Sequence, residues 1–582
     1  MKRIYIIITI ALTTLLLTSC SDYLDKELDS VLSEEKVFTN PEQTRNILIG
    51  IYTYIPDGLD VLHRRDNQFH GALRDVLSDN AITSWNIHIY HRMVQNTFTA
   101  QSNPMDYIWT DNWTVIRRCN LFMEHSHRSG ISNASVGGDD NRLLDRYNTE
   151  ARLLRALYHF ELAKYYGDIP ISTKTIDITN EEETNMFRTP ATEVFDWIAA
   201  ECDAVKDILP FYYESEGNWG RVSGAFAYAL KSRALLYKAS AFFNPSNNAQ
   251  WWSDAAQAAQ DFMTKNATLS QPFGLYTGGG ATSYQELFYM LPFLNNEVIM
   301  STAIRNTMSI ERNLLPEGFN GVSGRIDPTQ EFVDCFEMAN GMKITDPGSG
   351  YNPQNPYANR DPRLEQSVFY HDMEYGYPTS RKLDMSVGGI DANQGSNFGT
   401  FTGYYLKKYC NPAFNTVDAT LQRNQAHAWI LFRYAEILLN YAEARNEALG
   451  APDESVYSAI NQIRSRAGMP GLPEGLSKEQ MRDRIRNERR VELSFEEHRY
   501  FDVRRWRLFD DPVMREKMLD LHMMFINENG VYDVRPLSAN FSRAWTDRLY
   551  LFPIPYADTQ RAPNLGQNPG WAEQVGSYEG TV

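Results

Sequence analysis

Residues 143–166 have the sequence LLDRYNTEARLLRALYHFELAKYY, and this stretch decides the fold class. Its apolar residues recur at the spacing of one face of an α-helix, as at Leu154, Leu157, Tyr158, Leu162, Ala163 and Tyr166. A face this broad predicts a helix that packs against other helices instead of lying alone in water.

Helical patterns of similar length lie on both sides of this stretch. They cover residues 115–125, 192–209, 225–243, 253–264, 430–449 and 456–467. A further helix should begin at Pro41, because Asn40 can cap it and Glu42 places an acidic side chain in its first turn.

Paired helices with small residues and tyrosines at their contacts resemble tetratricopeptide units. Ala227, Ala234 and Ala239 would let such helices approach closely. A strict repeat of about 34 residues is absent, and a generic α-helical domain would show the same periodicity. We predict an all-α fold, a tetratricopeptide-like helical repeat scaffold (an α/α superhelix) that carries a long irregular, loop-rich subdomain.

The helical signal fails in two places. Residues 271–426 are rich in Gly, Pro, Asn and Tyr and predict the irregular subdomain, and a second irregular stretch covers residues 56–111. We therefore expect a helical N-terminal part at 39–270, with a binding loop near 56–111, and a C-terminal helical part at 427–582 that closes the same single domain. Loops held on a rigid scaffold commonly carry binding groups.

Residues 1–19 predict a secretory signal peptide, with a basic start, an apolar run over 4–17 and small residues before Cys20. The apolar run is too short to span a bilayer comfortably, which takes roughly 20 residues. A Cys directly after small residues matches a bacterial lipobox, so Cys20 would carry the acyl chains, such as palmitate, and residues 20–38 would form the lipidated N-terminus and tether. An ordinary cleavage site before a Cys, or a short anchor helix, is the alternative.

The formal net charge is −17, and loss of Lys2 and Arg3 with the signal peptide would make it −19. Nucleic-acid affinity comes largely from phosphate neutralisation, so we expect no nucleic-acid partner. Cys119 and Cys202 lie in helical patterns and are expected in the core, whereas the disulfide state of these two, Cys335 and Cys410 stays open. There is no Cys/His array of the zinc type, and we predict no metal ligands and no cofactor.

The sequence contains no nucleophile elbow, zinc-protease helix, phosphate-binding loop or dinucleotide fingerprint. Carboxylate pairs of glycoside hydrolases leave no sequence signature, because their separation in space defines them. In the charged segment 488–506, Glu492, Glu496 and His498 could form an acid/base group, with His498 four residues before Asp502 on one helix. We favour the other interpretation, in which these charges lock a helix against its neighbours, and we predict no catalytic residue.

The aromatic loops carry more information about function. A partly exposed ring offers a platform for the apolar face of a sugar, and flanking amides and acids can bind its hydroxyls. The candidate ligand-binding residues are Asp79, Asn80, Trp85, His88 and Tyr90 in the first irregular stretch, and Tyr284, Tyr289, Phe319 and Asn320 in the second. Trp85 is favoured among them, because its polar loop has no apolar periodicity that demands burial. The alternative is that these rings only fasten long loops to the scaffold.

Several motifs in a fixed order carry a family resemblance over nearly the whole mature chain. They are Cys20-Ser-Asp-Tyr-Leu-Asp, Glu150-Ala-Arg-Leu-Leu-Arg-Ala-Leu-Tyr-His-Phe, Tyr166-Gly-Asp-Ile-Pro170, Phe332-Val-Asp-Cys-Phe-Glu-Met338, Phe432-Arg-Tyr-Ala-Glu-Ile-Leu-Leu-Asn-Tyr-Ala-Glu-Ala, Glu488-Arg-Arg-Val-Glu-Leu, Phe552-Pro-Ile-Pro and Gln567-Asn-Pro-Gly-Trp571. With these motifs on a lipobox protein, the chain resembles the SusD/RagB family of outer-membrane nutrient-binding lipoproteins.

The resemblance implies a non-enzymatic protein that is lipid-anchored in the outer membrane and faces the cell exterior. It also implies two partners: a glycan, and a SusC-like TonB-dependent transporter on which such proteins sit like a lid and to which they deliver oligo- or polysaccharide. The RagB branch suggests a peptide ligand instead. A surface glycoside hydrolase with an aromatic cleft is the rival from another class, and a scaffold protein without any small ligand is a third.

Overall fold

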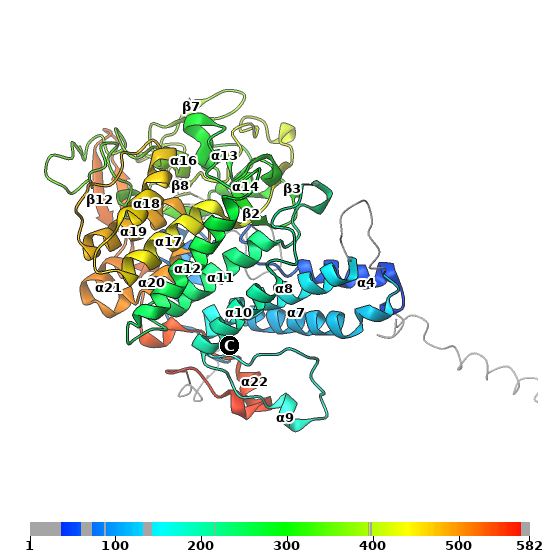
Figure 1. Cartoon of the computed structure of the whole chain (residues 1–582). Coiled ribbons are helices and arrows are strands. Elements are labelled where there is room, and N and C mark those ends of the chain that lie inside the picture. The colour runs from blue at the N-terminus through cyan, green and yellow to red at the C-terminus, as the bar shows by residue number, and fades with distance from the viewer. Residues whose placement is uncertain are drawn as a thin grey trace, which may run out of the picture.

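The computed structural model describes residues 37–59, 73–85, 89–131, 143–214, 216–393, 395 and 399–571 (Figure 1). The predicted signal peptide, the lipidation site Cys20 and nearly all of the predicted tether lie outside these residues.

Helices form the scaffold. Their bounds are α4 (Pro41–Tyr52), α7 (Asp106–His125), α8 (Leu143–Tyr166), α10 (Ala191–Val205), α11 (Gly224–Ala239), α12 (Ala249–Asn266), α17 (Tyr434–Ala448), α18 (Glu454–Arg466) and α19 (Lys478–Glu492). From α7 to α17 each of these packs on the next, and α17 also contacts α18 and α19 (Figure 1). The predicted mainly helical, tetratricopeptide-like fold class is confirmed.

Local sequence explains where several of these helices begin. Asn40 caps α4, because its side chain accepts hydrogen bonds from the amides of Glu42 and Gln43 at 2.9 and 3.0 Å. Ser477 starts α19 with a capping box, in which Gln480 N–H donates to Ser477 Oγ and the Gln480 side chain accepts from the Ser477 amide. The helix predicted from Asn40 and Pro41 is therefore confirmed.

The core lies between the helical row and the irregular region. One continuous cluster of buried apolar side chains runs from Phe38 to Trp571 and includes residues of both parts. Ala227, Ala234 and Ala239 on α11 are all fully buried, as the predicted close helix contacts require. Cys119 and Cys202 are buried free thiols on α7 and α10, which confirms their placement in the core.

The described part of residues 271–426 contains only short elements, as predicted. Its helices are α13 (Ser283–Glu286), α14 (Ser309–Leu314), α15 (Gln330–Asp334) and α16 (Pro362–Ser367). Its strands are β2 (Val298–Ser301), β3 (Arg305–Thr307), β4 (Ile326–Pro328), β5 (Val368–Phe369), β6 (Glu374–Tyr375), β7 (Arg381–Lys382), β8 (Tyr405–Leu406) and β9 (Gln425–His427). This region joins α12 to α17, which pack directly on each other, so it is an insertion into the helical row.

The remaining elements are shorter than the scaffold helices. They are β1 (Ala81–Thr83), α6 (Ile89–Val94), α9 (Glu181–Thr184), β10 (Ile430–Arg433), α20 (Arg499–Arg505), α21 (Pro512–Leu519), β11 (His522–Ile526), β12 (Tyr532–Pro536) and α22 (Tyr556–Arg561). The strands form antiparallel pairs, β1 with β4, β2 with β10, β3 with β9, β5 with β8, β6 with β7 and β11 with β12. Several pairs join segments far apart in the sequence.

Two predicted helices are corrected. The helix expected over 430–449 begins only at Tyr434, because residues 430–433 pair with β2 as strand β10. The helix expected through 488–506 is broken between α19 and α20, where Phe495 and Glu497 have positive φ angles of 58° and 67°. His498 and Asp502 therefore do not lie on one continuous helix with α19.

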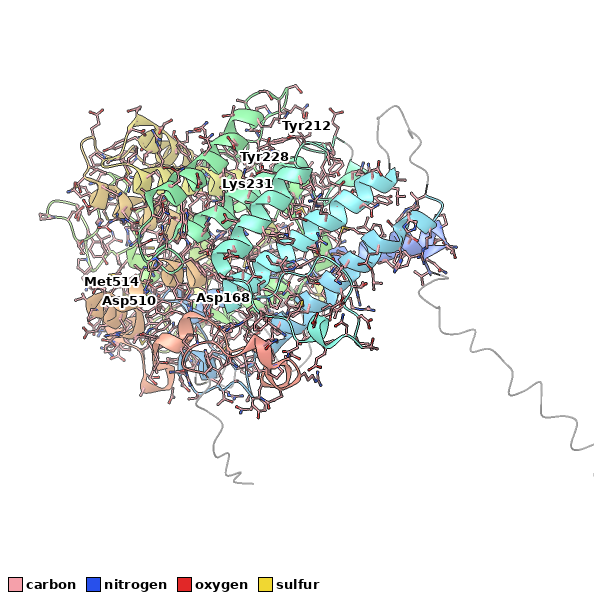
Figure 2. All side chains as sticks on the ribbon, turned by 60° about the horizontal axis from the view of Figure 1, so that its bottom comes forward. Asp168, Tyr212, Tyr228, Lys231, Asp510 and Met514 are labelled. Atoms are coloured by element: carbon pink, nitrogen blue, oxygen red, sulfur yellow. The ribbon has the colours of Figure 1, made fainter. Side chains whose placement is uncertain are left out.

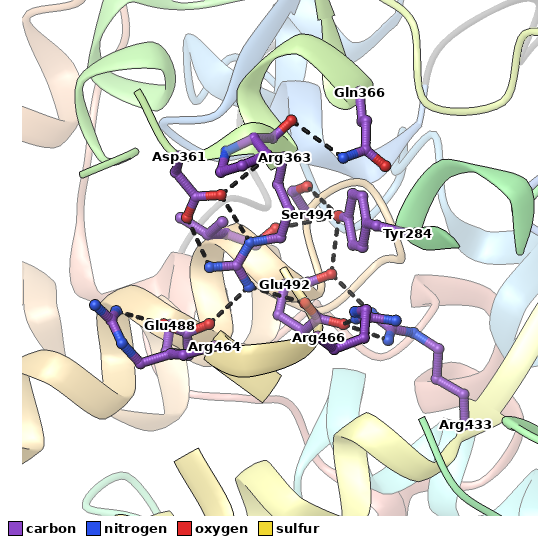
Figure 3. A network of polar contacts seen from close by, with 12 residues as sticks. Tyr284, Asp361, Arg363, Gln366, Arg433, Arg464, Arg466, Glu488, Glu492 and Ser494 are labelled. Atoms are coloured by element: carbon purple, nitrogen blue, oxygen red, sulfur yellow. Dashed lines mark hydrogen bonds and ion pairs between the residues drawn. The ribbon is translucent and has the colours of Figure 1, made fainter. Parts of the chain in front are cut away.

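The charges of this segment form a buried network (Figure 3). Arg363 donates to Glu488 at 2.6 Å and to Glu492 at 2.9 Å, while Arg433 donates to Glu492 at 2.6 Å. Burial would raise the pKa of Glu492, but Arg466, Arg433 and Arg363 outweigh it and hold that pKa well below its ordinary value. The interpretation of these residues as packing charges is confirmed.

Among the described residues, no helix combines the length and the apolar character needed to cross a bilayer.

Candidate ligand-binding site

The structure places Asp79 and Asn80 in the interior, which corrects their assignment as ligand-binding residues. Arg499 donates two hydrogen bonds to the Asp79 carboxylate, each of 2.8 Å, and Asn80 Nδ2 donates to Asp75 at 2.8 Å. Although burial opposes ionisation, Arg490 and Arg499 hold the pKa of Asp79 well below its ordinary value. Both side chains fasten their loop to α19 and α20.

Tyr90 and Tyr284 are also buried, so neither ring is available as an exposed platform. The Tyr284 hydroxyl donates to the Glu492 carbonyl at 3.0 Å and accepts from Lys408 at 2.8 Å, beside the buried charge network (Figure 3). These two rings fasten loops to the scaffold, which is the alternative that the sequence left open.

Trp85 lies where the two irregular stretches meet. The antiparallel pairing of β1 with β4 brings the two stretches together, and the Arg325 guanidinium lies 4.8 Å from the centre of the Trp85 ring. The indole is half-buried. The guanidinium supports the ring and covers part of its surface. Trp85 stays a predicted ligand contact.

The other candidates are scattered. Phe319 is largely buried under Arg381, whose guanidinium lies 4.3 Å from the ring centre, and Asn320 is exposed beside it. Tyr289 is half-buried, and burial followed by the nearby Glu286 raises its pKa to about 12. His88 lies outside the described residues. None of the eight described candidates lines the two cavities that follow.

Four tyrosines surround a cavity of about 690 Å³, which we call the tyrosine pocket. Tyr52 is the last residue of α4 and Tyr54 lies in the turn that follows it. Tyr107 comes from the first turn of α7 and Tyr165 from the end of α8. The segment 302–305, which follows β2, completes the wall. The cavity has the size typical of small-ligand sites, which is ~300–1,000 Å³.

Hydrogen bonds hold the wall of the tyrosine pocket in place. The Tyr52 hydroxyl donates to Glu150 at 2.8 Å and accepts from the Val222 amide at 3.1 Å. Burial, and then the Glu150 charge, raise the pKa of Tyr52 well above its ordinary value, so its phenol stays neutral. Thr302 exchanges two 2.9 Å hydrogen bonds with the Trp429 backbone. The rings are thus presented on a rigid frame.

Two charged groups of this pocket keep unused hydrogen-bonding capacity. Glu161 is buried and pairs through Oε2 with Lys164 at 2.7 Å, but its Oε1 has no hydrogen-bond partner among the described residues. The Arg118 guanidinium lies 5.0 Å from the centre of the Tyr54 ring and forms no ion pair with a described carboxylate. A ligand hydroxyl can accept a hydrogen bond from the guanidinium.

The carboxylates that line the pocket, Asp57, Asp111 and Glu161, are matched in number by its three guanidinium groups. Arg305 forms an ion pair with Asp57, and Arg74 forms an ion pair with Glu497 and donates to the Tyr107 hydroxyl at 3.3 Å. The arrangement therefore offers aromatic faces and hydrogen-bonding groups with little net charge, which suits an uncharged polyhydroxy ligand.

Reasoning from the sequence missed most of this pocket. The predicted binding stretch 56–111 contains Asp57, Arg74 and Tyr107, but the tyrosines of α4 and α8 have the helical spacing that predicts packing. The run Tyr52-Thr-Tyr54 at a helix end, directly before an irregular stretch, was the available signal.

Two family models match the chain. The model described as the SusD family matches residues 296–571, and the model described as starch-binding associating with outer membrane matches residues 22–236. SusD-like protein P2 of Formosa agariphila is 23% identical over 579 residues, which cover 97% of this chain and 99% of that protein. SusD-like protein P38 of the same organism is 24% identical and covers 86% and 91%.

Solved structures share the fold. A SusD-like protein from Bacteroides fragilis has a TM-score of 0.74 at 24% identity, covering 93% of this chain and 99% of its own. A SusD-like carbohydrate binding protein from that species has a TM-score of 0.72 at 22% identity, covering 91% and 100%. Surface glycan-binding protein A from Bacteroides uniformis has a TM-score of 0.59 at 21% identity, covering 90% and 99%.

Proposed function

The chain belongs to the SusD/RagB family, and we propose that it captures glycan at the cell surface in its tyrosine pocket without cleaving it. The observation that carries the proposal is the pocket itself, where the half-buried rings of three tyrosines lie with the Arg118 guanidinium, which forms no ion pair with a described carboxylate. Rings of this kind stack on the apolar faces of sugars, while the polar groups orient the hydroxyls.

We favour binding over hydrolysis because two of the three carboxylates that line the pocket are engaged in ion pairs. Asp57 is held by Arg305, and one oxygen of Glu161 is held by Lys164. Hydrolysis by the usual two-carboxylate route needs one free acid and one free base on either side of the scissile bond. The carboxylate pairing supports a binding role, and release of labelled products from a bound glycan would favour the hydrolase instead.

The proposal extends to anchoring and delivery. We propose that Cys20 carries the lipid, that the protein resides in the outer membrane facing the exterior, and that it hands its glycan to a SusC-like TonB-dependent transporter. The family model's association with the outer membrane supports this placement. Detergent extraction followed by purification through a tag on this chain should recover a large β-barrel transporter. Recovery of this chain alone would contradict the partnership.

The test of the binding site compares Tyr54→Ala and Arg118→Ala with the control Tyr377→Ala. Tyr54 and Arg118 are half-buried in the pocket, whereas Tyr377 is 49% exposed elsewhere. Loss of a binding-site aromatic commonly costs ~2 kcal/mol, so calorimetry should show roughly thirtyfold weaker glycan binding for Tyr54→Ala at an unchanged melting temperature. Tyr377→Ala should bind like the wild type.

Measurements on Trp85→Ala form a second arm of this experiment. Weaker binding at an unchanged melting temperature would make Trp85 a ligand contact, and a lower melting temperature would make it a support for the loop and for Arg325. If both pocket variants bind glycan as the wild type does, with their folds intact, the tyrosine pocket is not the binding site. A peptide that competes for the pocket would favour the RagB-like alternative.

A further inference from the structure

We infer that the protein has a second subsite beside the tyrosine pocket and that its ligand is a neutral linear oligosaccharide long enough to occupy both. The inference rests on the proposed glycan-binding function. It concerns a cavity of about 280 Å³, which we call the Trp219 pocket, lined by Tyr212, Tyr213, Trp219, Phe273 and Phe293 together with several amide side chains.

The two pockets are adjacent. Ser301, the last residue of β2, lines the Trp219 pocket, and the next residue, Thr302, lines the tyrosine pocket. Consecutive Cα atoms are only ~3.8 Å apart. Arg221, which lines the Trp219 pocket, donates a hydrogen bond to Glu150 at 2.7 Å. The Tyr52 hydroxyl in the wall of the tyrosine pocket donates to the same carboxylate. Both cavities therefore border on the end of the same strand and on residues that bind the same carboxylate.

The Trp219 pocket presents a fixed aromatic surface. The Trp219 and Phe293 rings meet edge to face, with centroids 6.3 Å apart and planes at 66°. Trp219 Nε1 donates to Ser301 Oγ at 3.3 Å, so the edge of the indole is anchored to β2, whose end borders on both pockets. Tyr212 lies beyond the N-terminal end of α11, on the side of Tyr228 away from Lys231 (Figure 2).

An amide of this pocket lacks a partner. Asn295 Oδ1 accepts hydrogen bonds from the amides of Glu297 and Val298 at 2.9 and 3.1 Å, which fix the side chain. Its Nδ2 is buried and has no partner among the described residues. Buried donors are normally satisfied, so this one is an exception in the wall of the pocket.

The charge of the Trp219 pocket points to an uncharged ligand. Its guanidinium, Arg221, is neutralised by Glu150, and Glu214 at the edge is exposed. The tyrosine pocket likewise carries little net charge. Together the two pockets offer aromatic faces and hydrogen-bonding groups over a length that a single sugar ring does not fill. A chain of neutral sugar units matches both features.

The experiment measures affinity against chain length. Linear malto-, cello-, xylo- and manno-oligosaccharides, from disaccharides to octasaccharides, are titrated calorimetrically into the full mature chain. We expect at least one series to bind, with the octasaccharide about tenfold tighter than the trisaccharide. Trp219→Ala should remove this gain while leaving the trisaccharide affinity within about twofold, whereas Tyr54→Ala should weaken both.

Two further variants make the result decisive. Trp251→Ala removes a half-buried indole of α12 outside both pockets and should change neither affinity. Tyr212→Ala should repeat the loss of the length-dependent gain and replaces Trp219→Ala if that variant does not fold. The second subsite is contradicted if affinity does not depend on chain length. It is also contradicted if the tighter binding of the longer oligosaccharide survives both Trp219→Ala and Tyr212→Ala. Neither result contradicts the proposed function. Failure of every series to bind overturns the proposed function and the inference with it.

Discussion

At the scale of single residues, Asp75 is a buried carboxyl that its surroundings keep protonated. Its Oδ1 accepts from Asn80 Nδ2 at 2.8 Å and from the Phe495 amide at 3.2 Å, while its Oδ2 has no partner among the described residues. Burial, and then repulsion by Glu497, raise the pKa of Asp75 to about 7, and Asn80, Phe495 and the more distant Lys408 oppose this only partly.

This pKa makes stability depend on pH. Between about pH 4 and pH 7 the unfolded chain has lost the Asp75 proton and the folded chain has kept it, so the free energy of unfolding falls as pH rises through this window. We predict that Asp75→Asn removes this fall and is more stable than the wild type at pH 8, by up to ~4 kcal/mol, with little difference at pH 4. Melting temperatures at both pH values check it.

The control for this prediction is Asp483→Asn, which changes an exposed carboxylate on α19. It should follow the wild-type pH profile. An Asp75→Asn variant that keeps the wild-type difference in melting temperature between pH 4 and pH 8 would show that another group carries the pH dependence.

At the scale of secondary-structure elements, close packing of α11 depends on alanines. Ala234 is fully buried on α11, which packs on α10, α12 and α17. Added methylene groups in a filled interface force side chains and backbone apart at a cost of ~1–3 kcal/mol. We therefore predict that Ala234→Leu lowers the melting temperature measured by calorimetry.

The matched control is Ala200→Leu on the exposed face of α10. Surface substitutions usually change stability by within ~0.5 kcal/mol, so this variant should melt close to the wild type. Equal melting temperatures for both variants would contradict the tight packing of α11.

The break between α19 and α20 is a feature of the secondary structure that the sequence did not predict. Helical spacing of charges continues through it, yet Phe495 and Glu497 have positive φ angles that such residues seldom adopt. Tertiary contacts hold this backbone: Glu497 accepts from the Arg74 amide at 2.7 Å, and Glu496 accepts from Lys408 at 2.7 Å. None of these partners is near in sequence.

At the scale of the whole molecule, the lipid anchor should decide where the protein resides. We predict that Cys20→Ala abolishes retention in the outer membrane while the circular dichroism spectrum stays that of a mainly helical protein, because lipidation at Cys20 precedes the described fold. Two or three acyl chains bind a membrane essentially permanently at ~0.8 kcal/mol per buried CH₂ group. Fractionation of cells that produce each form gives the measurement.

A Cys20→Ala protein that still fractionates with the outer membrane would contradict the anchor. Loss of the helical spectrum would instead show that the tether contributes to the fold.

The sequence by itself determined the mainly helical fold, the start of α4 and the loop-rich character of residues 271–426. Each of these depends on residues within a few positions of one another: the spacing that makes α8 amphipathic, Asn40 before Pro41, and the Gly- and Pro-rich composition of residues 271–426. Periodicity and capping are local physical effects, so a single sequence carries them.

Only the tertiary structure decided which side chains meet. Tyr54 and Tyr165 have the spacing of packed residues, yet they line a cavity with Arg305, while Tyr284 comes from a polar loop and is buried. The pocket is formed where α4, α7, α8 and the segment after β2 converge, and the fit between the surfaces of distant elements sets that convergence. Burial of one aromatic ring and exposure of another follow from this fit, which no local pattern specifies.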